Sequence, residues 1–309
     1  MNYIVLDLEW NQALDKSKED PRLLFEVIEI GAVKMDEAGA VTDRFDCLIC
    51  PQVYRRLHFR VREMTGLTAA RLEAEGKSFA EAFAAFNEWC GEDVMYCTWG
   101  SMDLTQLQLN VRYFGLENPY PYPFFYYDVQ KLYGLLIEDS KQQVSLEHAA
   151  EKLGIDQEKN FHRAVNDAEY TALILARLDR DFWKELVSVD YFRPPMKPEE
   201  EMHLKFRRYD KFVSMVYPDR ETLTEAESVR ELHCCLCDRP VQVKLPWFAE
   251  GTHYLALAQC GEHGWLKGKI RVKPFEDQVF AVKTVKMIGP RDAARIKEKH
   301  RELKDRRRR

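Results

Sequence analysis

A short apolar run near the start of the chain, from Tyr3 to Leu6, leads directly into two carboxylates, Asp7 and Glu9. If this run is a β-strand, both carboxylates point to the same face, because side chains alternate between the two faces of a strand. Two like charges held that close repel unless protons or cations neutralise them. The pair alone is more typical of a solvated strand end, so it is informative only if further carboxylates join it.

Strand-like and helix-like segments alternate over residues 1–180. Apolar runs bounded by turn residues predict strands over residues 3–8, 25–34, 43–49 and 94–97. Apolar residues at helical spacing predict helices over residues 79–90, 103–114, 128–137, 145–153 and 164–178. Strands that first form a meander and then alternate with helices predict an α/β domain, with a mixed sheet flanked by helices.

Two more carboxylates fall at the ends of predicted elements. Asp103 opens a predicted helix directly after a short strand, and Asp167 opens the last helix of this region. Each alone is also typical of a helix N-terminus, which an acid stabilises. Because α/β folds collect their sites at element ends, we expect all four carboxylates to meet. Such a cluster requires hard divalent cations, so we predict Mg²⁺ or Mn²⁺, with two ions if the chemistry is phosphoryl transfer.

One histidine, His162, is separated from Asp167 by four residues. A lone histidine is more often a structural hydrogen-bonding group than a catalyst. Beside a metal site, however, a neutral imidazole can take the proton from water as a general base, because its pKa lies near the working pH.

The order Asp-x-Glu, then Asp, then His-x₄-Asp resembles the DEDDh family of 3′→5′ exonucleases, the RNase T-like superfamily with a ribonuclease H-like fold. Four stretches are similar to that family's motifs: EVIEIGAV at 26–33, MTGLT at 64–68, CTWGSMD at 97–103 and HRAVNDA at 162–168. The residues in these motifs are most similar to those of the branch that trims small RNAs and histone messenger RNA 3′ ends. The resemblance covers about residues 1–180.

The resemblance implies a role for each of these residues. Four would ligate the metal ions and the fifth would activate water: Asp7, Glu9, Asp103 and Asp167, with His162 as the base. The implied substrate is the single-stranded 3′ end of a nucleic acid, with RNA favoured over DNA and nucleoside 5′-monophosphates released. The alternative is a noncatalytic nucleic-acid-binding or scaffold module, which would be expected to have lost at least one of the five residues.

The resemblance also indicates a set of substrate-binding residues, which are Trp10, Met64, Thr65 and Leu67. Met64 stands where the family's loop usually has Leu, and Trp10 follows the first motif where small residues or Thr are common. Aromatic and apolar side chains stack on bases without reading sequence, so both changes could alter how the terminal base is held. A packing role for Trp10 fits the sequence equally well.

The eight cysteines form two kinds of group. Cys234-x₂-Cys237 and Cys260-x₂-His263 have the paired spacing of a tetrahedral structural Zn²⁺ site and resemble a zinc ribbon. His233 and Cys235 are spare donors, so the identity of the fourth ligand stays open. Cys47 and Cys50 have no second pair nearby, and we expect them to be structural.

Charge and composition divide the 309 residues. Residues 1–190 hold 20 Lys and Arg against 33 Asp and Glu, net −13, whereas residues 191–309 hold 26 against 18, net +8. This asymmetry suggests a metal-demanding first domain and a second part able to meet a polyanion. We expect an exonuclease domain over 1–185, a linker or helical segment over 186–228, a small β-rich zinc-ribbon-like domain over 229–290 and a basic helical tail over 291–309.

A basic run lies within the predicted zinc-ribbon-like domain. Lys267, Lys269, Arg271 and Lys273 alternate along a strand-like segment next to Trp265, which would place them on one face. Such a face suits phosphate contacts, but lysines that protect an exposed edge strand from pairing explain the run equally well.

The sequence contains no run of 18 or more apolar residues, and its start does not look like a secretion leader. We therefore expect a cytoplasmic protein that does not associate with membranes. Protein partners cannot be inferred from these features.

Overall fold

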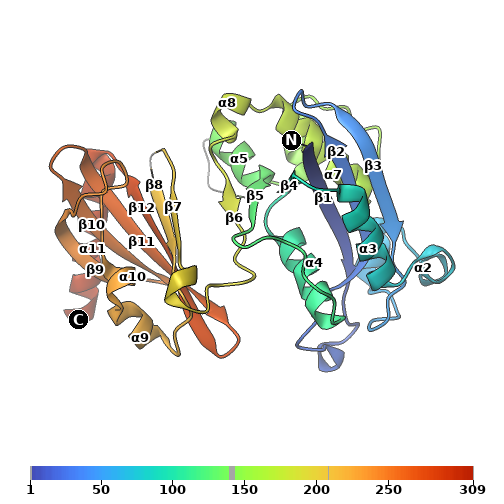
Figure 1. Cartoon of the computed structure of the whole chain (residues 1–309), viewed down its shortest axis with the longest axis horizontal. Coiled ribbons are helices and arrows are strands. Elements are labelled where there is room, and N and C mark those ends of the chain that lie inside the picture. The colour runs from blue at the N-terminus through green and yellow to red at the C-terminus, as the bar shows by residue number, and fades with distance from the viewer. Residues whose placement is uncertain (1, 139–142, 208, 309) are drawn as a thin grey trace. The chain divides into compact units, whose positions relative to one another are not determined.

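The computed structural model describes residues 2–138, 143–207 and 209–308, and the chain forms two compact units, Met1–Phe192 and Arg193–Arg309 (Figure 1). The first unit is an α/β domain, as the sequence predicts, and the second is built on a sheet of its own. No helix among the described residues is both long enough and apolar enough to span a membrane.

The sheet of the first unit is mixed and has six strands. Their order across the sheet is β3 (Val41–Leu48), β2 (Glu26–Met35), β1 (Asn2–Asn11), β4 (Val94–Thr98), β5 (Phe125–Asp128) and β6 (Ser188–Val189). Neighbouring strands are antiparallel from β3 to β1, parallel from β1 through β4 to β5, and antiparallel at β6. The strand that bears Asp7 and Glu9, β1, lies in the middle of the sheet, and both of its faces are covered by core clusters.

Eight α-helices are described in the first unit. They are α1 (Phe59–Thr65), α2 (Ala69–Glu75), α3 (Phe79–Cys90), α4 (Met102–Tyr113), α5 (Val129–Leu136), α6 (Leu146–Lys152), α7 (Ala164–Arg177) and α8 (Arg180–Trp183). Among its described residues, the first unit also contains short elements that the sequence did not predict, among them α1, α2 and β5. All three are short, so their apolar residues set no clear period along the chain.

The alternation of β1 supplies two hydrophobic cores. Ile4, Leu6 and Leu8 pack in one cluster with residues of α3 and α4. Tyr3 and Val5 point the other way, into a second cluster with residues of α5, α6 and α7. By the same alternation, Asp7 and Glu9 continue the face that α7 covers.

The second unit contains a six-stranded antiparallel sheet. Its order is β7 (Met202–Lys205), β8 (Tyr209–Val213), β12 (Gln278–Met287), β11 (Gly264–Phe275), β10 (His253–Cys260) and β9 (Gln242–Glu250). The short helices α9 (Arg220–Glu225) and α10 (Glu227–Arg230) contribute Leu223 and Val229 to a core cluster with Ile270 of β11. A long helix, α11 (Pro290–Arg308), ends the described chain.

The division of the chain differs from the expected one at two places. Residues 186–228, expected as a linker, supply β6 to the first sheet and β7 and β8 to the second. The boundary between the two units falls after residue 192, whereas the sequence suggested residue 185. These three strands were not predicted from the sequence because they are only two to five residues long and lie among prolines and acids. The expected basic tail is helical, but it is also packed, because Ala293 and Ile296 form a cluster with Leu257 of β10.

Candidate active site and metal centre

Asp7 and Glu9 lie side by side on one face of β1. In the register with β2, Asp7 pairs with Gly31 and Glu9 pairs with Glu29. The register with β2 shifts between Glu9 and Trp10, so the regular pairing is interrupted there. The two carboxylates therefore stand at the point where the regular part of β1 ends.

Asp103 reaches β1 from the first turn of α4. Its side chain is buried, and Oδ1 accepts a hydrogen bond of 3.2 Å from the backbone N–H of Leu8. Leu8 lies between Asp7 and Glu9 in the chain, so this bond fixes the third carboxylate against the strand that carries the first two.

Asp167 is brought to the site by a close approach of α7 to β2. A Cβ atom at Gly31 would lie 2.0 Å from the backbone N of Val165 and 2.1 Å from the carbonyl carbon of Ala164. The first turn of α7 can therefore sit on β2 only because residue 31 has no side chain. Since Gly31 is the cross-strand partner of Asp7, this contact brings Asp167 towards Asp7.

His162 precedes α7 in a left-handed backbone conformation, with φ of 62°. Its N–H donates to Oδ2 of Asp167 at 3.0 Å, and its ring Nε2 lies 3.6 Å from Oε1 of Glu147 on α6. One ligand atom each from Glu9, His162 and Asp167 can be chosen so that all three lie within 4.8 Å of one another. The ring is partly exposed, so water can reach it.

Burial raises the pKa of every carboxylate in this cluster, and the charges of neighbouring acids raise those of Asp7, Glu9 and Asp167 further. Burial, followed by the charges of Asp167, Glu29 and Asp103, raises the pKa of Glu9 to about 8. Burial raises the pKa values of Asp103 and Asp167 to about 7 each, and burial with the charge of Asp103 raises the pKa of Asp7 well above its ordinary value. A cluster with these pKa values is held together by protons or by cations.

The donors at this site suit a divalent cation such as Mg²⁺ or Mn²⁺. All four side chains offer carboxylate oxygens, which are the ligands that these hard ions prefer. Oδ1 of Asp167 is buried and has no hydrogen-bond partner among the described residues. An acceptor left in that state is costly, and a cation would satisfy it.

An ion pair that the sequence did not reveal lies behind the carboxylates. Arg163 donates to Glu29 through Nε at 3.0 Å and through Nη2 at 2.7 Å, and Glu29 is fully buried. Arg163 follows His162 directly, and its charge lowers the pKa of Glu9 in part. The signal for this pair was the acid at the centre of the apolar strand β2, since a buried charge requires a partner.

The residues expected to bind substrate occupy different environments. Met64 is 53% exposed on α1, and Trp10 is partly buried with its ring centroid 5.9 Å from that of Phe25. Thr65 is buried and its hydroxyl donates to Val61 O. Leu67 is fully buried in a hydrophobic cluster. The structure therefore gives Thr65 and Leu67 internal contacts, and leaves Met64 and part of Trp10 with surface for a ligand.

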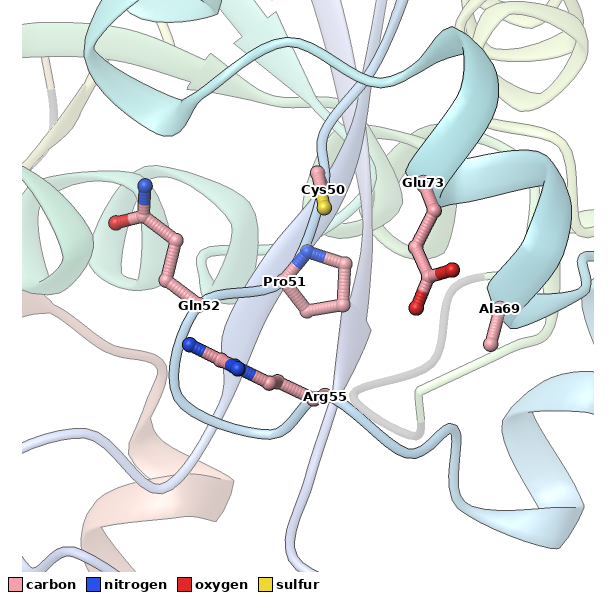
Figure 2. Close-up of a pocket in the computed structure, with 6 residues that line it drawn as sticks. All are labelled: Cys50, Pro51, Gln52, Arg55, Ala69 and Glu73. Atoms are coloured by element: carbon pink, nitrogen blue, oxygen red, sulfur yellow. The ribbon is translucent and has the colours of Figure 1, made fainter.

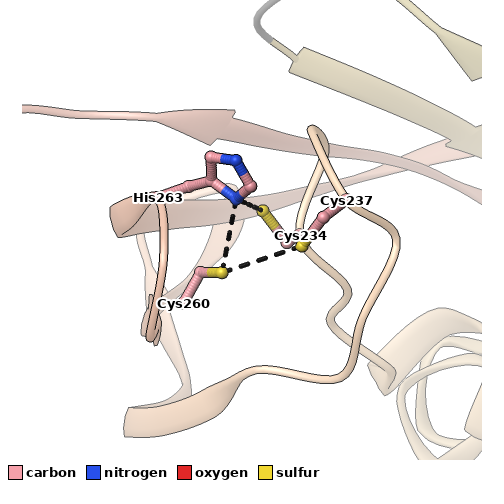
Figure 3. Close-up of side chains that lie close together, drawn as sticks. All are labelled: Cys234, Cys237, Cys260 and His263. Carbon is pink, nitrogen blue, oxygen red and sulfur yellow. Dashed lines mark hydrogen bonds between the residues drawn. The ribbon is translucent and has the colours of Figure 1, made fainter.

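Cys234, Cys237, Cys260 and His263 converge in the second unit (Figure 3). Nδ1 of His263 lies 3.6 Å from the Sγ atoms of both Cys234 and Cys260, and the Sγ atoms of Cys237 and Cys260 are 3.8 Å apart. A tetrahedral zinc ion with Zn–S of about 2.3 Å and Zn–N of about 2.0–2.1 Å spaces its ligand atoms about 3.6–3.8 Å apart. The four donors therefore fit zinc.

The spare donors stand outside this cluster. Cys235 is buried, and the Nδ1 atom of His233 lies 4.0 Å from Asp238. Within the cluster of four donors, backbone N–H groups, first that of His263, lower the pKa of Cys260 to about 6, which favours the thiolate that a metal binds.

Cys47 and Cys50 are free thiols in the first unit. Cys50 lines a pocket of about 280 Å³ together with Gln52, Arg55 and Glu73, at the start of the loop that follows β3 (Figure 2). Cys47 is buried in the core cluster beneath α3, which matches its expected structural role.

Comparison with known proteins relates the first unit to nucleases. A family model described as "Exonuclease" (RNase_T) matches residues 4–175. The PolC-type DNA polymerase III of Clostridium perfringens is 32% identical over 175 residues, which are 56% of this chain but 11% of the polymerase. This chain therefore spans about a tenth of that relative.

Two further curated relatives are shorter. The DNA polymerase III subunit epsilon of Aquifex aeolicus is 26% identical over 191 residues, covering 62% of this chain and 86% of that protein. The 3′-5′ exoribonuclease 1 of Mus musculus is 26% identical over 167 residues, covering 51% of this chain and 48% of that protein.

Solved structures share the fold of the first unit. The nuclease domain of 3′hExo, a DEDDh family member bound to rAMP, aligns with a TM-score of 0.52 at 20% identity, over 61% of this chain and 96% of that one. Cell-death related nuclease 4 aligns with a TM-score of 0.51 at 17% identity, over 64% of this chain and 73% of that one. The ribonuclease H-like fold expected from the sequence is thereby confirmed.

Proposed function

Because this chain belongs to the exonuclease family of the RNase T type, we propose that it is a metal-dependent 3′→5′ exonuclease. It removes nucleotides from single-stranded 3′ ends of nucleic acid, favours RNA over DNA, and releases nucleoside 5′-monophosphates. The observation that supports this proposal is the meeting of Asp7, Glu9, Asp103 and Asp167 in a buried cluster, where burial raises the pKa of all four side chains.

In this proposal the four carboxylates hold two Mg²⁺ or Mn²⁺ ions. When bound, such ions polarise the scissile phosphate and lower the pKa of water. The contribution of the chain is to fix the ligands before substrate arrives: Leu8 N–H holds Asp103, and His162 N–H holds Asp167. Carboxylates anchored in this way lose little further freedom when ions and substrate bind.

His162 takes the proton from the attacking water at its ring. Its imidazole is partly exposed and stands within reach of Glu9 and Asp167. Oε1 of Glu147 lies 3.6 Å from Nε2, so it can pair with the ring once the proton has arrived.

The proposed preference for RNA rests on the similarity of the sequence motifs to those of the RNA-trimming branch, and not on an observed contact to the 2′-OH. The relatives named above include a DNA polymerase, a DNA polymerase subunit and an exoribonuclease. Chemistry at the phosphate is the same for both polymers, so the preference must come from contacts to the 2′-OH. Met64 and the exposed part of Trp10 are the candidate surfaces for the terminal nucleotide.

The proposal is tested on the full chain with Mg²⁺ or Mn²⁺ and 5′-labelled RNA and DNA oligonucleotides of matched sequence, single-stranded and duplex. We expect a ladder of products shortened from the 3′ end. Asp103→Asn should lower turnover by about 10³-fold, because several kcal/mol of metal-dependent stabilisation are lost. The matched control is Asp156→Asn, an exposed acid of the same unit, which should keep full activity.

Three outcomes would count against the proposal. Intact oligonucleotides after incubation with either metal would favour a noncatalytic binding module. Full activity of Asp103→Asn, with an unchanged thermal melt, would mean that the metal ligands are wrongly assigned. Faster degradation of DNA than of RNA would reverse the substrate preference while keeping the nuclease.

A further inference from the structure

A basic segment lies within the acidic first unit. Residues 55–62 read RRLHFRVR, and all eight are described by the structure. They hold four arginines and no Asp or Glu, whereas residues 1–190 as a whole carry a net charge of −13. The arginine segment, as we call residues 55–62, covers the end of the loop after β3 and the first four residues of α1.

Two buried polar side chains fix the backbone of this region. Nδ2 of Asn11 donates to the carbonyl oxygens of Tyr54 and Arg56 at 2.8 and 3.0 Å, and Oδ1 of Asn11 accepts from the N–H of His58 at 2.9 Å. Glu26, the cross-strand partner of Asn11, accepts from the backbone N–H groups of residues 52–54. The arginine segment is therefore held in place before any ligand arrives.

This anchor connects the arginine segment to the strand that carries the metal ligands. Asn11 stands two residues beyond Glu9, which is about 7 Å along a strand. At its other end, the segment continues through α1 to Met64, a candidate surface for the terminal nucleotide. Arg60 and Met64 are four residues apart on this helix, so they lie on the same side of it.

The side chains of the segment divide into an inner and an outer set. Leu57 and Val61 pack inwards against a hydrophobic cluster. Phe59 is 56% exposed, and its ring centroid lies 4.5 Å from that of the buried His58. The guanidinium carbon of Arg60 lies 5.7 Å from the centroid of the Phe59 ring. An exposed aromatic ring that is supported from beneath and flanked by cations suits a nucleobase, which stacks on such a ring.

Acids border the arginine segment without pairing with it. Glu26 is buried and occupied by backbone N–H groups, and Asp20 pairs with Arg22. Glu63 of α1 is exposed, as is Glu73, which lines a pocket together with the first arginine of the segment (Figure 2). None of the four guanidinium groups forms an ion pair or a hydrogen bond with a residue that the structure describes.

The other basic run of the chain is placed differently. It lies on β11, an interior strand of the second sheet, so its lysines protect no edge. The face that bears Lys267 is the one on which α11 packs, because Leu257, the cross-strand partner of Lys267, forms a cluster with Ala293 and Ile296. The arginine segment, in contrast, leaves its cations exposed.

We propose that the arginine segment is a subsite for the nucleotides that precede the 3′-terminal nucleotide of a single-stranded substrate. Its arginines contact the phosphates of these nucleotides, and Phe59 stacks on one of their bases. A guanidinium group matches the geometry of a phosphate with two parallel hydrogen bonds, which a lysine cannot offer. The choice of nucleic acid as the ligand rests on the proposed function of the first unit.

The test measures binding by full-length protein that carries Asp103→Asn, in which turnover is suppressed. Two variants are made in this background, Arg60→Gln/Arg62→Gln and Phe59→Ala. Fluorescence anisotropy with a labelled single-stranded 12-mer is measured from 0.05 to 0.5 M salt, and thermal melts are recorded alongside.

The matched control is Arg177→Gln/Lys184→Gln. It removes two exposed cations of the same unit, one from the last turn of α7 and one from the residue that follows α8. Arg177 is ten residues beyond Asp167, which is about 15 Å along the helix.

We expect Arg60→Gln/Arg62→Gln to flatten the slope of log K against log salt by about 1.4, which corresponds to roughly 25-fold weaker binding at 0.1 M salt. Phe59→Ala should weaken binding at least about fivefold and leave the slope unchanged, because a stacking contact involves no charge. The control should change neither quantity, and the melting temperature of the arginine variant should stay that of the parent.

In the background that keeps Asp103, Arg60→Gln/Arg62→Gln should raise KM for the 12-mer and leave kcat unchanged. Contacts to nucleotides remote from the scissile bond stabilise the bound substrate and the transition state equally. A fall in kcat at constant KM would contradict the placement of the subsite.

Two further results would overturn the proposal. The first is an unchanged salt slope in the arginine variant, and the second is an equal loss of binding in the control, which would mean that any cation of the unit contributes as much. Because anisotropy is measured without turnover, a chain that binds through these residues but degrades nothing would retain the subsite and lose the nuclease proposal. A chain that degrades oligonucleotides with unaltered binding in the variants would do the reverse.

Discussion

Glu9 is a largely buried carboxylate beside other acids, so its negative charge must be neutralised by a proton or by a bound cation. Its pKa of about 8 means that, without metal, most Glu9 side chains are protonated at neutral pH. A protonated carboxyl is a poor metal ligand, so metal binding must release that proton. Because Glu9 must lose its proton before it can bind a metal ion, metal binding at this site should depend on pH.

We predict that the metal-free protein loses stability as pH rises from about 4.5 to 8. The carboxyl pKa of Glu9 is about 8 in the folded state against 4.5 ordinarily, and those of Asp103 and Asp167 are about 7 against 3.8. The folded state therefore binds more protons across this window, and its stability falls with increasing pH. Thermal melts at pH 5, 6.5 and 8 measure this effect.

Adding Mn²⁺ should raise the melting temperature more at pH 8 than at pH 5, because the ligands are then deprotonated. The variant Glu9→Gln should show a shallower loss of stability with pH, since it removes one titrating group. An equal response to Mn²⁺ at both pH values would contradict the assignment of these side chains as metal ligands.

At the scale of elements, the site depends on how closely α7 approaches the sheet. Gly31 is the position in β2 where the first turn of α7 meets the strand, and it faces Asp7 across the β1–β2 pair. A glycine inside a strand normally weakens it, and here it marks a close backbone approach.

Replacing Gly31 by Ala should displace α7 and with it Asp167. The added Cβ would overlap backbone atoms of Ala164 and Val165, and overpacking of this kind costs about 1–3 kcal/mol. Urea unfolding and turnover should both be impaired, turnover more strongly because metal ligands must be well placed. Gly289→Ala is the matched control, since a Cβ there meets nothing within 4 Å, and wild-type behaviour of Gly31→Ala would contradict this account.

The elements show what the sequence could and could not predict. The helices α3 and α7 were predictable because their apolar residues recur at helical spacing, and the strands β1 and β2 because each is a continuous apolar run. Asp103 and Asp167 were predictable as well, because each opens a helix within a recognisable motif. The pairing of Arg163 with Glu29 was not, because 134 positions separate them and only the docking of α7 on β2 joins them.

At the scale of the whole molecule, each unit has its own core and its own group of side chains that could hold a metal ion. The first has an oxygen-rich carboxylate cluster and the second a cluster of three cysteines and one histidine. The strands β7 and β8 could not be assigned to the second sheet from sequence, since such short strands gain their stability from pairing with β12. The expected zinc-ribbon-like domain is consequently part of a larger sheet.

We predict one tightly bound Zn²⁺ per chain and a thermal transition that depends on it. Cys237→Ser should lose the zinc and lower the melting temperature of the second unit by at least about 5 °C, the shift expected for roughly 1 kcal/mol in a domain of this size. Cys50→Ser, a free thiol of the first unit, is the control. Metal analysis and calorimetry test this, and full zinc content in Cys237→Ser would contradict the ligand set.

The seat of α7 on Gly31 also has a consequence for a chain that is still being synthesised. Asp7, Glu9 and Asp103 leave the ribosome first, whereas His162 and Asp167 belong to the last long helical segment of the first unit. Without Asp167 and His162 the carboxylate cluster is incomplete. The cluster can therefore form only after α7 has emerged and docked on β2.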